Sequence, residues 1–218
     1  MAAEKKASKG YLTGDKEEIA ERAAGDEAAL AAVFEALSGE DRRMRVLAAR
    51  SIHVLSIKTP DVLRPHAEHL IDALDRPEPQ TRWEVLGAFE QLVAVDARLI
   101  AKAITAVSTA LHDAESGVVR LAAFRVLAAY GATTENRSEK VWPLIDEAIR
   151  VYHGDPEFPA MLVGVVRLVQ GSASKDVKTA AAERMVFDSE HTKGLVGRRA
   201  KQIVSCGNLP PKPVEEDE

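Results

Sequence analysis

A helical pattern that returns every 37 to 39 residues is the feature that most constrains how this 218-residue chain can fold. The ends of successive amphipathic stretches fall at residues 35–37, 72–74, 109–111 and 147–149, which are spaced by 37, 37 and 38 residues. A fixed period of this length is typical of architectures in which one small structural unit stacks on the next. The period therefore predicts a stack of repeats.

Each repeat carries a second apolar stripe, which predicts a second helix. Its apolar residues stand at i, i+1, i+4 and i+7, so they share one face of an α-helix. The fourth stripe follows the third after 39 residues, and we place one extra residue in that unit's turn. The stripes are Ala48, Ala49, Ile52 and Leu55; Val85, Leu86, Phe89 and Leu92; Ala122, Ala123, Val126 and Ala129; and Met161, Leu162, Val165 and Leu168.

Cap signals help to place the helices. Thr59-Pro60, Asp96-Ala97 and Asp155-Pro156 each join an N-cap side chain to a residue suited to the first helical turn. We predict a short helix near 15–24, helix pairs at 26–37/41–57, 60–75/79–93, 97–112/116–130 and 138–152/156–169, and a looser pair at 174–187/192–204.

Composition agrees with closely packed helices. Aromatic residues make up only 5 % of the chain, whereas alanine occurs 35 times, and small side chains let helices approach each other. We predict one solenoid over residues 15–205, with units near 26–57, 60–93, 97–130, 138–169 and 174–204. A flexible segment, 1–14, precedes it, and an acidic, Pro-rich tail, 206–218, follows it.

The repeats resemble HEAT repeats, which belong to the armadillo-like superhelical class. In that family the first helix often carries a proline, and an Asp after it forms a ladder with an Arg early in the second helix. The resemblance implies an all-α, right-handed superhelical α-α solenoid of about five helix pairs, in which these charges tie consecutive turns together. The matching residues are Pro65 and Pro143, Asp75 with Arg82, Asp113 with Arg120, and, less closely, Ser38 with Arg45; the fourth unit departs from the pattern at Pro159.

Motifs for catalysis or cofactor binding are missing from the sequence. It has no Gly-rich phosphate loop and no Gly-x-Ser-x-Gly turn, and its one cysteine, Cys206, cannot form an internal disulfide or a cysteine metal cluster. His66 and His69 are neighbours on one helix face, but a metal site would need a third ligand, such as Asp72. We expect no catalysis, no cofactor and no metal.

The segment 1–10 has lysines but no apolar stretch after them, and no apolar run approaches the roughly 20 residues that a membrane span needs. We therefore expect a soluble, cytoplasmic protein without membrane contact.

Apolar side chains on the second helices, away from the core stripes, indicate a binding surface. We predict a groove on the concave face formed by the second helices and interpret the protein as a non-catalytic protein-binding or assembly scaffold for another protein or peptide. Aromatic anchors and rim arginines are typical of such surfaces. The predicted partner-binding residues are Arg82, Trp83, Arg120, Phe124 and Val163.

Three alternatives stay open. A HEAT-like enzyme of the DNA glycosylase or lyase type would act in a basic concave groove. The candidates for that groove are Arg42, Arg43, Arg45, Arg50, Arg82 with Trp83, and Arg120 with Arg125. A net charge of −5 disfavours nucleic acid. The apolar face could instead be a homodimer seam, or adjacent turns of the same chain could cover it.

Overall fold

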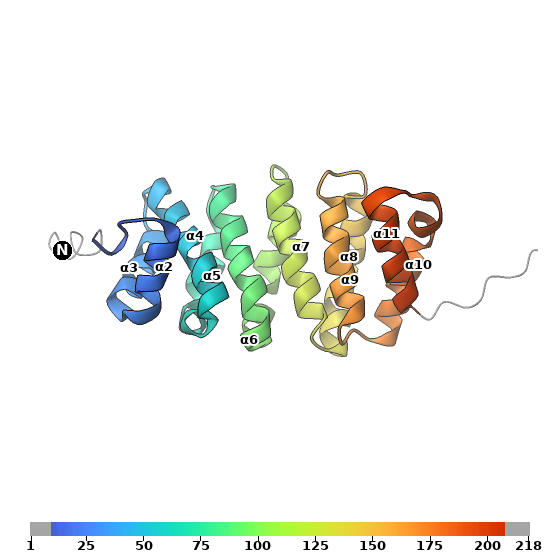
Figure 1. The fold of residues 1–218 in the computed structure, drawn as a ribbon, viewed down its shortest axis with the longest axis horizontal. Coiled ribbons are helices and arrows are strands. Elements are labelled where there is room, and N and C mark those ends of the chain that lie inside the picture. Colours follow the sequence, from blue (N-terminus) through green and yellow to red (C-terminus); the bar gives the residue numbers. More distant parts are fainter. Residues whose placement is uncertain (1–9, 208–218) are drawn as a thin grey trace, which may run out of the picture. The chain divides into compact units, whose positions relative to one another are not determined.

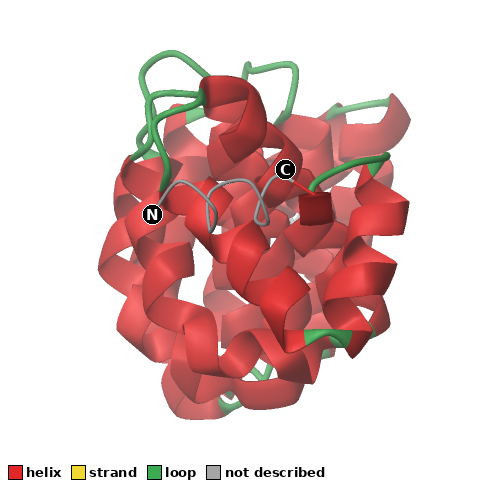
Figure 2. Ribbon diagram, turned by 90° about the vertical axis from the view of Figure 1, so that its left-hand side faces the viewer, coloured by secondary structure: helices red, strands yellow, loops and turns green. Residues whose placement is uncertain are grey.

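The computed structural model of the protein describes residues 10–207, and within this range every regular element is helical (Figure 2). The fold is all-α, as predicted. The α-helices are α2 (Lys16–Gly25), α3 (Glu27–Ser38), α4 (Arg42–Lys58), α5 (Ala67–Asp72), α6 (Pro79–Leu111), α7 (Gly117–Gly131), α8 (Glu135–Val151), α9 (Phe158–Gln170), α10 (Lys175–His191) and α11 (Gly194–Cys206).

The backbone divides into two compact units between Tyr130 and Gly131. In the first unit α2 and α3 pack against α4, and α4 packs along α6. In the second unit α10 packs against α11, and α9 contacts both α8 and α11. Within each unit the helices thus pack side by side in a stack (Figure 1).

The predicted apolar stripes lie in the core, except that Ala122 of the third stripe is only partly buried. The residues of the first stripe are at most 1 % exposed, and Met161, Leu162, Val165 and Leu168 are fully buried. The 39-residue step that places this last set on one face is therefore confirmed. Burial of these stripes is the main favourable contribution to the fold.

Side-chain caps fix several helix starts. Asp15, Asp26, Asp41, Thr134 and Ser174 each accept hydrogen bonds from backbone N–H groups in the first turn of the helix that follows. Asp96, with φ −152° and ψ 90°, interrupts α6, and its side chain accepts from the backbone N–H of Arg98 at 3.0 Å. The predicted helix start at Asp96-Ala97 is confirmed as this kink.

Two expectations about helix starts are wrong. The predicted helix 60–75 consists of a 3₁₀ segment (Pro60–His66), α5 and a second 3₁₀ turn (Ala73–Asp75), and the side chain of Thr59 makes no cap hydrogen bond. Pro65 explains the break, because it lacks the N–H of an α-helical hydrogen bond and its ring crowds the preceding turn. The helix expected from Pro156 begins at Phe158, since Asp155 and Pro156 lie in the preceding turn.

Most of the predicted flexible segment 1–14 and of the predicted tail 206–218 lies outside the described residues. No helix of the described chain is both long enough and apolar enough to cross a membrane.

Candidate functional site

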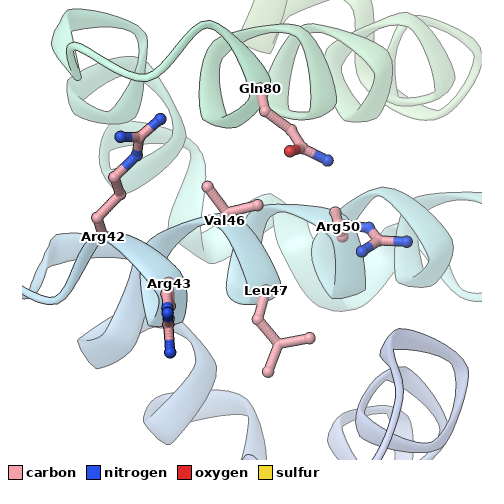
Figure 3. Close-up of a pocket in the computed structure, with 6 residues that line it drawn as sticks. All are labelled: Arg42, Arg43, Val46, Leu47, Arg50 and Gln80. Atoms are coloured by element: carbon pink, nitrogen blue, oxygen red, sulfur yellow. The ribbon is translucent and has the colours of Figure 1, made fainter.

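The helix α4 has a buried face and an open face. Its core stripe faces inward. Residues on the face of α4 away from this stripe line an open groove with a volume of about 420 Å³. Figure 3 shows Gln80 pointing from α6 toward Val46, while Arg43 and Leu47 extend from the other side of α4. We call this surface the α4 groove; its lining residues are Arg42, Arg43, Val46, Leu47, Arg50 and Gln80.

The charge of the α4 groove is positive. Arg42 and Arg43 are exposed and Arg50 is partly buried. None of the three guanidinium groups forms an ion pair or hydrogen bond with another described residue, and none of the lining residues is acidic. Arginines that form no ion pair on a surface of this kind attract anions.

Arg45 has a different role from these neighbours, because it points into the protein. Its side chain is 10 % exposed and forms an ion pair with Glu78, which is 5 % exposed. Arg45 Nε donates to Glu78 Oε2 at 3.1 Å, and Nη1 donates to the Gly39 carbonyl at 2.8 Å. The hydrogen bond from Arg45 holds the pKa of Glu78 below its ordinary value despite burial.

Two of the predicted rim arginines contact Asp113. Arg82 forms an ion pair with the Asp113 carboxylate, and Arg120 Nη1 donates to the Asp113 carbonyl at 2.9 Å. The ladder thus connects consecutive repeats, as the resemblance implied. One pairing was wrong: Arg82 binds Asp113 of the next repeat rather than Asp75, just as Arg45 binds Glu78.

Trp83 is partly buried on α6, next to a His–Glu pair. His53 Nδ1 lies 2.6 Å from Glu84 Oε2, and a Cβ atom on Gly87 would meet the His53 ring at 2.5 Å. Burial raises the pKa of Glu84, but hydrogen bonds from His53 and Trp83 and the charges of His53 and Arg50 leave it below its ordinary value. Gly87 thus leaves room for the ring that pairs with Glu84.

Phe124 and Val163 differ in exposure. Phe124 is 0 % exposed, so the expectation that it lies away from the core is wrong. Val163 is 44 % exposed on α9, whose other large apolar side chains are nearly all buried. Most of the apolar surface of α9 is therefore covered by other parts of the same chain. For this helix, that agrees with the alternative that adjacent turns cover the apolar face.

His66 and His69 lie against an aromatic ring. The Phe34 ring stacks on His66 with centroids 4.2 Å apart. Burial, and then the charge of His69, lower the pKa of His66. Among the described residues no group of three or more His, Cys, Asp or Glu side chains could hold a metal ion.

Sequence reasoning missed Leu47 and Gln80 in the groove, Glu78 as the ion-pair partner of Arg45, and His53 as the hydrogen-bond partner of Glu84. A signal existed for Glu78. Both Glu78 and Asp113 are acidic residues that shortly precede the next second helix, 33 and 31 residues after the arginine they bind. The sequence contains no comparable signal for His53, because its contact with Glu84 depends on how two helices cross.

No protein-family model and no curated protein matches the sequence. Solved structures do resemble the fold. A designed armadillo repeat protein in complex with the peptide (KR)4 aligns with a TM-score of 0.71 and 16 % identity, covering 95 % of this chain and 92 % of that one. An engineered protein aligns with a TM-score of 0.67 and 15 % identity, covering 95 % and 98 %.

A natural protein is also similar. The archaeal HEAT-like repeats protein from Thermococcus onnurineus NA1 aligns with a TM-score of 0.65 and 17 % identity, covering 97 % of this chain and 83 % of that one. Identities this low show the fold alone. Together with the repeat period and the arginine ladder, they establish that this chain has the HEAT- and armadillo-like α-solenoid repeat fold.

Proposed function

We propose that the chain is a non-catalytic protein-binding or assembly scaffold whose partner docks on the face formed by the second helices. The observation that carries the proposal is the α4 groove, which combines an apolar floor, Val46 and Leu47, with arginines whose guanidinium groups form no ion pair or hydrogen bond with the described residues. The designed armadillo neighbour supports it, since that protein has a similar fold and forms a complex with the peptide (KR)4. A cytoplasmic location stays a prediction.

Trp83 is the aromatic anchor that we retain in the first unit, because it is partly exposed on α6, the helix that also supplies Gln80. Arg82 and Arg120 now have a second role: their bonds to Asp113 position the start of the neighbouring helix, so they support the surface. Phe124 is no longer proposed as a partner-binding residue, because its side chain is fully buried. Val163 is proposed as a separate contact on α9.

The enzyme alternative lacks part of what it needs at the α4 groove. Its arginines would suit a phosphate backbone, but a glycosylase-type site also needs side chains that stack on an extruded base and an acid or base that acts on it. The groove's lining residues include neither an aromatic ring nor a carboxylate. We therefore propose binding without catalysis.

Affinity capture from the native organism tests the proposal. We expect Val46→Asp and Trp83→Ala to abolish capture of the main partner while the helical circular dichroism and the melting temperature stay unchanged. Val151→Asp is the matched control, because Val151 is an exposed apolar residue, 61 % accessible, at the end of α8. Capture that survives both substitutions, Val46→Asp in the groove and Trp83→Ala on α6, would contradict the proposal.

A further inference from the structure

We propose that the α4 groove recognises an acidic peptide segment, whose carboxylates bind Arg42, Arg43 and Arg50 while an apolar side chain between them packs on Val46 and Leu47. The inference rests on the proposed function and names the chemistry of the partner. Arginine suits this role because its planar guanidinium group can donate two parallel hydrogen bonds to one carboxylate.

The first argument is that the guanidinium groups of the groove form no ion pair or hydrogen bond with the described residues. The two carboxylates whose pKa values respond to Arg42 and Arg50 are those of Glu78 and Glu84. Glu78 is already bound by Arg45, and Glu84 lies 2.6 Å from His53 Nδ1. The guanidinium groups of the groove therefore remain available to a ligand from outside.

The second argument is where two of these arginines stand. Arg42 and Arg43 occupy the first turn of α4, where the helix dipole disfavours cations, and that turn holds no acidic residue. Asp41 caps α4 by accepting from the backbone N–H groups of Arg43 and Met44. Because Asp41 already occupies the N–H groups of Arg43 and Met44, an anion would bind chiefly to the side chains, and a bound carboxylate would relieve the unfavourable charge.

The third argument separates a peptide from a nucleic acid. Proteins that bind single strands stack the bases on aromatic rings and follow the phosphates along an extended basic groove. The α4 groove is lined without an aromatic residue, and its volume of about 420 Å³ suits a few side chains. Arginines flanking an apolar floor instead match a segment in which acidic and apolar residues alternate.

Fluorescence anisotropy with the full chain tests the inference. The probe is a fluorescein-labelled peptide with the repeated sequence Glu-Glu-Leu, compared with the same peptide carrying Gln in place of Glu and with a labelled oligo-dT strand. We expect the Glu peptide to bind at least tenfold more tightly than the Gln peptide, with an affinity that falls as salt rises. Tighter binding of oligo-dT than of the Glu peptide would overturn the inference.

Charge reversal locates the binding site. Arg43→Glu and Arg50→Glu together should weaken binding of the Glu peptide at least tenfold without lowering the melting temperature, and a peptide with Lys in place of Glu should then bind. Lys102→Glu, an exposed charge reversal on α6 outside the groove, is the matched control and should change nothing. Unchanged affinity in the double variant would overturn the inference.

Two results connect this test with the wider proposal. If deleting residues 208–218, which carry Glu215, Glu216, Asp217 and Glu218, raises the affinity for the Glu peptide, an acidic segment of the chain itself competes for the groove, which supports the inference. If the Glu peptide does not bind while partner capture still depends on Val46 and Trp83, the inference fails and the proposed scaffold function stands. Loss of both dependences would overturn both.

Discussion

At the scale of single residues, the buried pair of Arg45 and Glu78 joins α4 to the start of α6. Glu78→Gln would leave a buried guanidinium group without its counter-charge, and removing one partner of a buried pair typically costs about 3–5 kcal/mol. We expect a loss near the lower end of that range, measured by urea denaturation at pH 7. Replacing both residues with methionine should recover most of it, because no unpaired charge then remains.

The same pair should make stability depend on pH. Arg45 lowers the pKa of Glu78 in the folded state, so its contribution is complete above the ordinary value of 4.5 and is lost as the pH falls through the lowered folded-state value. The free energy of unfolding of the Glu78→Gln variant should therefore fall less steeply between pH 5 and about pH 3 than that of the unmodified protein. If the free energies of unfolding of the two proteins fell in parallel over this pH range, the lowered pKa of Glu78 in the folded state would be contradicted.

Single residues were also where sequence reasoning reached its limit. Phe124 occupies the repeat position of Arg50 and Gly87, yet its side chain is fully buried whereas Arg50 lines an open groove. Repeat spacing identifies equivalent positions, but exposure depends on what the neighbouring helices place opposite each one. Arg82 and Arg120 form the ladder that the resemblance implied, through Asp113, but Arg82 pairs with Asp113 rather than with Asp75. Their place on the rim of a partner groove stays a prediction.

At the scale of elements, Gly197 decides how α11 follows α10. A glycine inside a helix ordinarily costs stability, so alanine would be favoured by about 1 kcal/mol. Here a Cβ atom would lie 1.8 Å from the Thr192 carbonyl oxygen, which belongs to the backbone and cannot rotate away. We expect Gly197→Ala to destabilise the protein by about 1–3 kcal/mol in urea denaturation, as overpacking does.

Gly25, the last residue of α2, provides the control for this prediction. Nothing lies within 4 Å of its Cβ position, so Gly25→Ala should be neutral or stabilising by about 0.5 kcal/mol. Equal effects of the two substitutions would contradict the packing of α11 on the turn before it. The sequence predicts a helix at or next to both glycines, and only the structure shows that a Cβ atom has room at Gly25 and none at Gly197.

Elements were predicted best where one strong signal acted alone. The stripes on α4 and α9 gave the buried faces, and Asp96 gave the kink in α6. Signals in conflict were harder to weigh. The apolar pattern of 60–75 favours a helix while Pro65 opposes it, and the outcome, two 3₁₀ segments around α5, depends on packing that the pattern does not encode.

At the scale of the whole molecule, the repeat period predicted the stacking of helix pairs, but no signal in the sequence marks the division between Tyr130 and Gly131. The period lengthens from 37 residues to 38 and 39 residues across this point, but a longer turn does not by itself predict a division between two units. A division of this kind follows from how densely neighbouring helices contact each other, which depends on side-chain detail in every pair.

This division predicts that a core defect will act locally. Met161 is fully buried on α9, and Met161→Ala should cost about 2–5 kcal/mol. Because repeat proteins gain stability mainly from neighbouring contacts, hydrogen exchange should accelerate by roughly 30-fold or more in α8–α11 and change little in α2–α4. Val163→Ala, on the exposed side of the same helix, should leave the hydrogen-exchange rates of both regions nearly unchanged. Equal acceleration of both regions by Met161→Ala would mean that the chain unfolds as one cooperative unit, and the two compact units would then have no energetic counterpart.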